Sequence, residues 1–212
     1  MIRAVIFDCD GVMFDTVKAN TAYYNRVLAH FDRPEMTPAQ FEFIQMHTVA
    51  ESISFLFKED AAIQAATAYR DAMGYAPFYQ LMEIEPDLKP LLAKIRPRYP
   101  VAVATNRSDT IGQVLTVHGL EGAFELVVSA LDVPRPKPHP DPLLKVVDHF
   151  NLKPDEAIYI GDSSLDEQAA RAAGMPLVAY RNRSLRAAAH IDHLMDVATL
   201  LDSGRSFSAD ML

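Results

Sequence analysis

Short runs of apolar residues, each ending at a polar residue, recur along this chain and predict buried strands. The first run, residues 4–7 (AVIF), stops at Asp8. Later runs of the same kind occur within 99–106, 124–130, 157–162 and 176–180, separated by segments of helical periodicity at 108–119, 141–150 and 166–174. Continuously apolar strands that alternate with helices are typical of a parallel sheet covered on both faces. The pattern therefore predicts an α/β fold with a doubly wound parallel sheet.

The segment between Asp15 and Met82 contains no predicted strand. Residues 16–31 place apolar side chains at helical spacing, and helical periodicity returns from Ala39 to Met73, with Gly74 as the predicted stop. A helical module therefore interrupts the sheet directly after its first strand. The predicted domains are an α/β catalytic core, residues 1–15 and 87–212, and an inserted helical cap, residues 16–86.

Composition and charge limit the partners. Half of the 212 residues are apolar, and the formal net charge of −8 argues against sequence-independent binding of nucleic acid. No segment has the roughly 18 uncharged apolar residues of a membrane span, and the single cysteine, Cys9, fits a reducing compartment. We expect a cytoplasmic protein with no nucleic-acid or membrane partner, while the oligomeric state stays open. The polar tail, 202–212, is expected to be frayed.

Polar side chains follow the predicted strands at the points where those strands end. They are Asp8 and Asp10 after the first strand, Thr105 after the second, Lys137 in the loop after the third and Asp162 after the fourth. Ligands of open parallel sheets bind outside the carboxyl ends of the strands, so these side chains should converge. Crowded carboxylates repel one another unless they share protons or hold a cation, and Mg²⁺ prefers oxygen ligands. The sequence therefore predicts a Mg²⁺ site.

A cation in this place would attract an anion, and the neighbouring groups suit a phosphate. Lys137 can hold a phosphate oxygen as a point charge. The Thr105 hydroxyl and backbone N–H groups near Asn106 and Gly11 can complete the cradle. The predicted ligand is therefore a phosphoryl group of a small phosphorylated metabolite.

Two acidic side chains at one strand end offer two chemical roles. Alternate side chains of an extended chain share a face, so Asp8 and Asp10 can both point toward one substrate. One carboxylate can attack phosphorus to form an acyl-phosphate. The other can protonate the leaving alcohol and later deprotonate the water that hydrolyses the intermediate.

These motifs resemble those of the haloacid dehalogenase superfamily, in its phosphohydrolase branch with a helical cap inserted after the first strand. The matching segments occur in the family's order and are Asp8–Val12 (DCDGV), Thr105, Lys137–Asp141 (KPHPD) and Gly161–Asp166 (GDSSLD). The resemblance covers nearly the whole chain.

The resemblance implies a role for each matching residue. Asp8 would be the nucleophile and Asp10 the general acid/base, with Thr105 and Lys137 completing the catalytic set. The Mg²⁺ ligands would be the carboxylates of Asp8 and Asp162 and the backbone carbonyl of Asp10. Asp166 would support Lys137 and metal-bound water, although Asp162 and Asp166 also suit capping of the helix that follows them.

Within the superfamily, the segment ATNRS (104–108) resembles the T-N-[KR] motif of phosphoglycolate phosphatase-like members. An aspartate at position 10 favours phosphate esters over dehalogenation, because the leaving oxygen of an ester needs a proton. The predicted function is Mg²⁺-dependent hydrolysis of a small phosphorylated metabolite through an aspartyl-phosphate.

Two other functions stay open. A β-phosphoglucomutase-like sugar-phosphate mutase has a similar opening segment, but such mutases commonly carry histidine where this chain has Asn20, and a cap arginine that QMHTVAES (45–52) lacks. A phosphate-accepting regulatory module would also combine acidic residues, a threonine and a lysine on a doubly wound sheet. Signalling receivers, however, carry the acceptor on another strand and lack an inserted helical domain.

Candidate substrate contacts come from the cap and from the second strand end. His47 and Thr48 lie in a polar stretch between predicted helices, from which a cap loop could reach a substrate. A solvated or helix-terminal place is the alternative for both. Arg107 is predicted either as a substrate contact or as a surface arginine.

Overall fold

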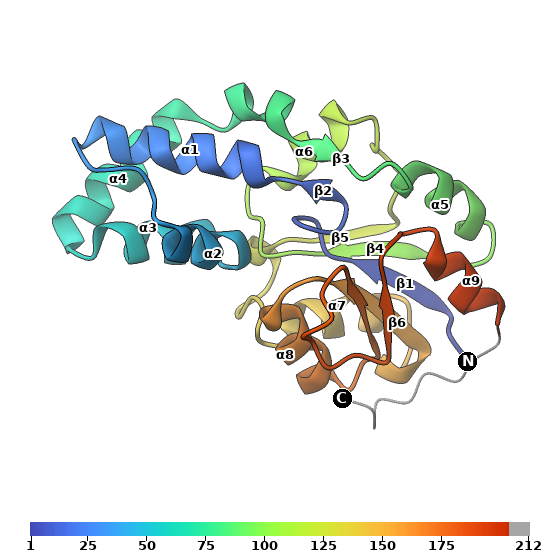
Figure 1. Ribbon diagram of the computed structural model, residues 1–212. Coiled ribbons are helices and arrows are strands. Elements are labelled where there is room, and N and C mark those ends of the chain that lie inside the picture. The colour runs from blue at the N-terminus through green and yellow to red at the C-terminus, as the bar shows by residue number, and fades with distance from the viewer. Residues whose placement is uncertain (204–212) are drawn as a thin grey trace. The chain divides into compact units, whose positions relative to one another are not determined.

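The computed structural model describes residues 1–203 (Figure 1). They divide into two compact units: one combines Met1–Phe14 with the segment that begins at Ile84, and the other is Asp15–Glu83. The predicted frayed tail lies, from residue 204 onward, outside the described residues. The predicted cap, 16–86, has slightly different bounds from the second unit, and its role as a cap stays a prediction.

The first unit is built on a six-stranded sheet in which every neighbouring pair is parallel. In spatial order the strands are β5 (Leu126–Val128), β4 (Val101–Ala104), β1 (Ala4–Phe7), β6 (Ala157–Gly161), β7 (Leu177–Tyr180) and β8 (Ala189–Ile191). The doubly wound parallel sheet predicted from the sequence is therefore confirmed.

The register brings the ends of the three central strands together. Phe7 of β1 lies opposite Val103 of β4 and Ile160 of β6. Strands β1, β4, β6 and β7 are buried along their whole length, as their continuous apolar sequences predict. We call the edge of the sheet at which these strands end the carboxyl edge.

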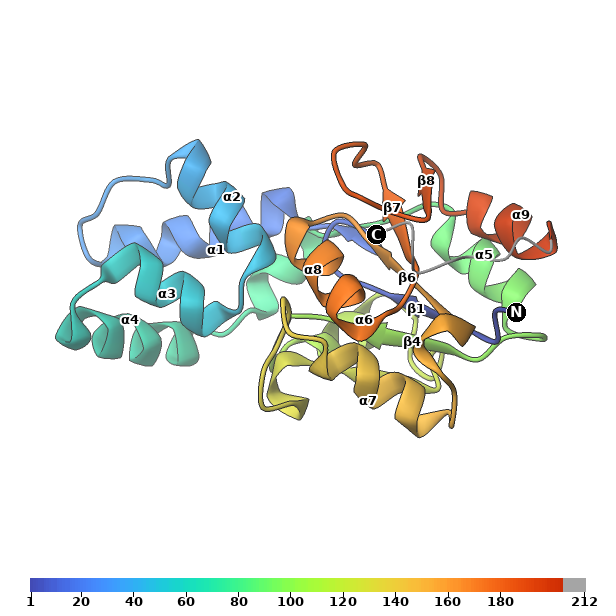
Figure 2. The ribbon, with the colours of Figure 1, turned by 90° about the horizontal axis from the view of Figure 1, so that it is seen from below.

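Helices cover both faces of the sheet, as Figures 1 and 2 show. Helices α7 and α8 pack on one face, where their apolar side chains join Ala4, Ile6 and Tyr159 of the strands in one buried cluster. Helices α5 and α9 contact each other on the opposite face. The helices of this unit are α5 (Leu88–Ile95), α6 (Ile111–Val117), α7 (Asp141–His149), α8 (Ser164–Ala173) and α9 (Asp196–Asp202), with short 3₁₀ turns η2 (Ala130–Asp132) and η3 (Pro154–Glu156).

The second unit is helical. Its elements are α1 (Val17–His30), α2 (Pro38–Met46), α3 (Val49–Phe57), α4 (Asp60–Met73) and η1 (Ala76–Leu81). A buried aromatic group holds α1 to η1, with the Tyr23 ring 4.9 Å from that of Tyr75 and 5.4 Å from that of Phe78. The short strands β2 (Phe14–Asp15) and β3 (Glu83–Ile84) pair where the chain passes between the units.

The helical periodicity predicted from Ala39 to Met73 is divided among three helices. Helix α2 ends before Thr48, whose side chain caps α3 through a reciprocal capping box with Glu51. Helix α3 ends at Lys58, which has a positive φ of 63°. Gly74 ends α4, as predicted, with a φ of 66°.

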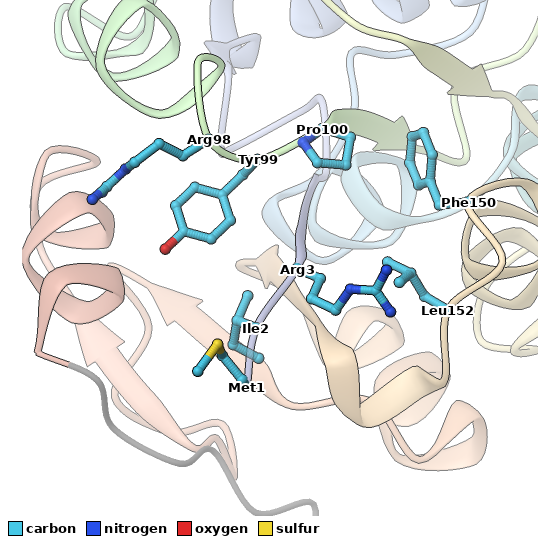
Figure 3. Close-up of a pocket in the computed structure, with 8 residues that line it drawn as sticks. All are labelled: Met1, Ile2, Arg3, Arg98, Tyr99, Pro100, Phe150 and Leu152. Carbon is cyan, nitrogen blue, oxygen red and sulfur yellow. The ribbon is translucent and has the colours of Figure 1, made fainter.

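Two further features bear on function. Among residues 1–203, no helix combines the length and apolar character that a membrane crossing requires. A surface hollow of about 460 Å³ lies at the amino end of β1, and its lining residues are Met1, Ile2, Arg3, Arg98, Tyr99, Pro100, Phe150 and Leu152 (Figure 3). The hollow lies at the opposite end of β1 from Asp8, away from the predicted chemistry.

Candidate active site

Three carboxylates meet at the carboxyl edge of the sheet. Asp8 follows β1, Asp162 follows β6, and Asp166 lies in the first turn of α8. One oxygen from each side chain lies within 4.8 Å of the other two. Asp8 and Asp166 are buried and Asp162 is partly exposed. The structure therefore brings together the acidic residues that the sequence placed at two separate strand ends.

Two glycines make this close approach possible. A Cβ atom on Gly11 would lie 2.1 Å from Oδ2 of Asp162, and the φ of Gly11 is +84°. A Cβ atom on Gly161 would lie 2.5 Å from Cβ of Asp166. Any side chain at either position would displace a carboxylate of the cluster.

Lys137 contacts two of the three carboxylates, those of Asp8 and Asp166. Its side chain is 3 % exposed, and Nζ donates hydrogen bonds to Oδ1 of Asp166 (2.6 Å) and to the Tyr159 hydroxyl (2.9 Å). Nζ also lies 2.8 Å from Oδ1 of Asp8. This contact is an ion pair, and Oδ1 of Asp8 is buried with no other polar partner among the described residues.

Asp166 serves both the helix and the lysine. Its Oδ2 accepts hydrogen bonds from the Ser163 hydroxyl (2.6 Å) and from the backbone N–H groups of Ser163 (3.0 Å) and Asp162 (3.2 Å). Its Oδ1 faces Lys137 and Tyr159. The capping role and the support of Lys137 therefore occur together.

Thr105 and Asn106 follow β4 and are both buried. The Thr105 hydroxyl oxygen accepts a hydrogen bond from the backbone N–H of Arg107 (3.0 Å). The side-chain amide of Asn106 donates to the backbone carbonyl of Lys137 and accepts from the backbone N–H of Lys137, both at 2.9 Å. Asn106 thus fixes the main chain that carries the lysine.

Arg107 contacts Asp10 through a two-point ion pair. Nε lies 3.0 Å from Oδ2 of Asp10, and Nη2 lies 2.6 Å from Oδ1. The two side chains are 6 % and 15 % exposed. Nη1 of Arg107 donates to the Thr110 hydroxyl (3.0 Å) at the start of α6. Arg107 therefore lies beside the second acidic residue of the first motif.

Burial and mutual repulsion perturb the acidic groups. Burial raises the pKa of Asp8 to about 7, although the Lys137 charge opposes the change. Burial, together with the charges of Asp166 and Asp8, raises the pKa of Asp162 well above its usual range. Burial acts in the same direction on Asp166, but the Lys137 charge and hydrogen bonds leave its pKa lowered.

The acidic cluster fits a divalent cation. Asp8 and Asp162 are hard oxygen donors, and burial raises the pKa of both carboxyl groups despite the nearby Lys137 charge. The buried Oδ1 of Asp8 has no hydrogen-bond partner in the described part of the chain. A cation between these groups would compensate both charges. The residues present could therefore hold a metal ion.

The two predicted cap contacts lie in the second unit and have local partners. Nδ1 of His47 is 2.8 Å from the carbonyl oxygen of Phe43, and the two rings stack at 3.7 Å. The Thr48 hydroxyl donates to Oε2 of Glu51 (2.7 Å) as part of the α3 capping box. Each residue thus has a structural role, and a substrate role for either stays a prediction.

Two contributors to the site were missed in the sequence. The Tyr159 hydroxyl lies 2.6 Å from Oδ1 of Asp166 and accepts a hydrogen bond from Lys137. In the sequence, a tyrosine inside an apolar run indicates only a strand. Asn182 donates to the backbone carbonyl of Asp162 (2.7 Å) from the loop after β7. Its place after the next strand along the sheet was the signal that could have identified it.

Comparisons with known proteins identify the relatives of this chain. Residues 5–180 match the family of haloacid dehalogenase-like hydrolases. The chain is 30% identical over 191 residues to a phosphoglycolate phosphatase of Pseudomonas putida, covering 83% of this chain and 68% of that protein. It is also 30% identical over 181 residues to a fructose-1-phosphate phosphatase of Escherichia coli, covering 84% and 95% of the two chains.

A solved structure extends the likeness to the fold. The crystal structure of a subfamily IA hydrolase of the same superfamily, from Geobacter sulfurreducens, superimposes with a TM-score of 0.78 at 37% identity. The match covers 94% of this chain and 96% of that one. With the family match over most of its length, this chain belongs to the haloacid dehalogenase-like hydrolases, as its four motifs indicated.

Proposed function

We propose that the protein is a Mg²⁺-dependent phosphatase that hydrolyses a small phosphorylated metabolite of the phosphoglycolate type through an aspartyl-phosphate. The observation that carries the proposal is the buried contact of Asp8 with Lys137, beside Asp162, at the carboxyl edge. An acidic nucleophile, a cationic phosphate ligand and a candidate metal site then occupy one place. The relatives named above, both phosphomonoesterases, support this reaction class.

In the first half of the proposed reaction, a carboxylate oxygen of Asp8 attacks phosphorus. The bond from phosphorus to the leaving oxygen breaks, and Asp10 gives its proton to that oxygen. Lys137 lies 2.8 Å from Asp8 and can bind a phosphoryl oxygen at the same point. The Thr105 hydroxyl and the backbone near Asn106 and Gly11 are the further proposed phosphate ligands.

In the second half, Asp10 accepts a proton from water while that water attacks phosphorus. The bond from phosphorus to Asp8 breaks, releasing inorganic phosphate and restoring the carboxylate. Mg²⁺ would be held by Asp8, Asp162 and the carbonyl of Asp10, and would neutralise negative charge on carboxylates and phosphate. Asp166 keeps Lys137 charged and in place through its 2.6 Å hydrogen bond.

The substrate class follows from the second motif and from the relatives. The T-N-R segment at 105–107 and the phosphoglycolate phosphatase of Pseudomonas putida both favour a small organic phosphate. We also propose that the helical unit, Asp15–Glu83, acts as the cap that selects the leaving group, with His47 and Thr48 as contacts. A cytoplasmic location and the lack of a nucleic-acid partner stay predictions from composition and charge.

The test is phosphate release from a panel of phosphorylated metabolites in the presence of Mg²⁺. We expect release from small organic phosphates, loss of release in Asp8→Asn, and unchanged release in Asp202→Asn. The control residue is an acid that pairs with Arg98 at 2.6 Å, remote from the carboxyl edge.

Three results would contradict the proposal, and each has a distinct meaning. No release from any compound would refute a phosphatase. Isomerised sugar phosphate from a hexose 1-phosphate, without free phosphate, would establish the mutase. A stable acyl-phosphate with negligible turnover would establish the regulatory module.

A further inference from the structure

Arg107, which follows Thr105 and Asn106, has a partner that the sequence alone does not reveal. Arg107 has an almost buried side chain, and its guanidinium group forms two nearly parallel hydrogen bonds with the carboxylate of Asp10, at 3.0 and 2.6 Å. Such two-point pairs fix the plane of a carboxylate as well as its position. Asp10 is the general acid/base of the proposed reaction.

Arg107 is itself held at both ends. Its backbone N–H donates to the Thr105 hydroxyl (3.0 Å), and its carbonyl accepts from the backbone N–H of Ala130 (3.2 Å). At the other end, Nη1 donates to the Thr110 hydroxyl (3.0 Å). The main chain of Arg107 is therefore held by the end of β4 and the turn after β5, and its guanidinium group by the start of α6. An arginine held in this way can orient its partner.

The two-point pair with Arg107, called the fork below, does not use the whole acceptor capacity of the Asp10 carboxylate. A carboxylate has two oxygens with about four acceptor directions, and a two-point arginine occupies one direction on each oxygen. The guanidinium charge favours the ionised carboxylate, which is the form that accepts a proton from water. A proton that Asp10 then carries can pass to the leaving oxygen. A proton donor must lie within hydrogen-bond reach of that oxygen, so the orientation of the Asp10 carboxylate sets the efficiency of the transfer.

We propose that Arg107 is a positioning residue that orients the carboxylate of Asp10 for proton transfer to the leaving group, rather than a substrate ligand. Three of its nitrogen atoms already donate to Asp10 and Thr110. Binding a substrate through the same guanidinium would remove it from the acid/base. This inference rests on the proposed function, since it assigns the partner of Asp10 in that reaction.

The experiment compares leaving groups in wild type, Arg107→Ala and Arg107→Lys. The substrates are an aryl phosphate, an alkyl phosphate whose alcohol carries no charge, and phosphoglycolate, and the quantity is kcat/KM, which reports formation of the aspartyl-phosphate. Aryl oxygens leave without protonation, whereas alkyl oxygens need the acid. General acid catalysis contributes about 10²- to 10⁴-fold, so misorientation should cost the alkyl ester roughly 10- to 100-fold.

We expect both substitutions to lower kcat/KM for the alkyl ester at least about tenfold more than for the aryl ester. Lysine should not rescue, because an ammonium group cannot form the two-point fork. The inhibition constant of inorganic phosphate should stay unchanged, which separates positioning from phosphate binding. Should Arg107→Ala fail to fold, Arg107→Lys carries the same comparison.

A double-mutant cycle with Asp10→Asn isolates the pair. If Arg107 acts through Asp10, Arg107→Ala should cause no further loss of kcat/KM in the Asp10→Asn background. The control is Arg98→Ala, because Arg98 forms an ion pair with Asp202 (2.6 Å) on the surface, away from the carboxyl edge. The control should leave the ratio of alkyl to aryl rates unchanged.

Several outcomes would overturn the inference while leaving the phosphatase intact. The first two are equal losses of kcat/KM for alkyl and aryl esters in the Arg107 variants, and a full additional loss of kcat/KM when Arg107→Ala is added to Asp10→Asn. The other two are many-fold weaker inhibition of the Arg107 variants by phosphate, and a loss of kcat/KM for phosphoglycolate that exceeds the loss for the uncharged alkyl ester. The last two would show direct contact with the substrate. A wild-type protein that cleaves none of the three esters would refute the proposed function and this inference together.

Discussion

Replacing the proposed nucleophile should stabilise the metal-free protein. Asp8 is 6 % exposed, and burial raises the pKa of its carboxyl group to about 7 from its usual 3.8, with the nearby Asp166 and Asp10 charges adding to the rise and Lys137 opposing it. Above pH 7 the folded protein therefore carries a buried charge that the unfolded chain accommodates more readily. Asp8→Asn removes that charge with little change of shape.

The magnitude follows from linkage between protonation and folding. Below pH 3.8 both states of the wild type bind the Asp8 proton, so ionisation has no effect on stability. As the pH rises, the unfolded chain releases the proton first, and the wild type loses stability until folded Asp8 ionises near pH 7. At about 1.4 kcal/mol per pKa unit, the loss reaches about 4 kcal/mol.

The assay is urea unfolding in a chelator at pH 5 and pH 8. The asparagine side chain of the variant does not titrate, so the free energy of unfolding of the variant, relative to wild type, should rise between these pH values. Asp202→Asn is the control: its hydrogen bond with Arg98 lowers the pKa of Asp202, so this variant should gain no stability at pH 8. A variant less stable than wild type at pH 8, or a difference equal at both pH values, would refute the reasoning.

Further predictions concern the other groups of the site. Mg²⁺ should raise the Tm of the wild type, because ligand at 100 times its Kd adds about 2.7 kcal/mol to the free energy of unfolding. Asp162→Asn should abolish that rise in Tm. Gly11→Ala should destabilise the protein by about 1–2 kcal/mol, because the φ of +84° strains alanine. It should also remove the rise in Tm with Mg²⁺, since the new Cβ atom would displace Asp162. Thermal unfolding with and without Mg²⁺ measures both effects. Lys137→Ala should cost about 3–5 kcal/mol in urea unfolding, because it leaves Asp166 buried without its cation. Asp10→Asn should lower kcat/KM for alkyl phosphates far more than for aryl phosphates, and equal losses would contradict an acid role for Asp10.

The sequence predicted the elements whose signal is local. Strands β1, β4, β6 and β7 are apolar and fully buried, so the run of side chains alone identifies them. Strand β8, Ala189–Ile191, was missed because it is short, contains a histidine and is only partly buried at the edge of the sheet. The break at Lys58 was missed because a lysine with positive φ has no sequence signature.

The site shows the same division between local motifs and distant pairs. The motifs placed Asp8, Lys137 and Asp162 at strand ends, and the parallel register brings those ends together. The pairing of Arg107 with Asp10 joins residues 97 positions apart. It depends on β4 lying next to β1, an order of strands that the apolar runs do not specify. Sequence could therefore identify the chemical groups but not which of them would pair.

The hydrogen bonds also distinguish the three carboxylates as candidate cation ligands. One oxygen of Asp166 lies within 4.8 Å of an oxygen of Asp8 and of Asp162. Both oxygens of Asp166 already accept hydrogen bonds, Oδ1 from Lys137 and Tyr159 and Oδ2 from Ser163. Its pKa is lowered, whereas those of Asp8 and Asp162 are raised. A bound cation would therefore favour ionisation of Asp8 and Asp162 most, because these two have the raised pKa values. A metal ion should take its side-chain ligands from Asp8 and Asp162, while Asp166 acts through Lys137.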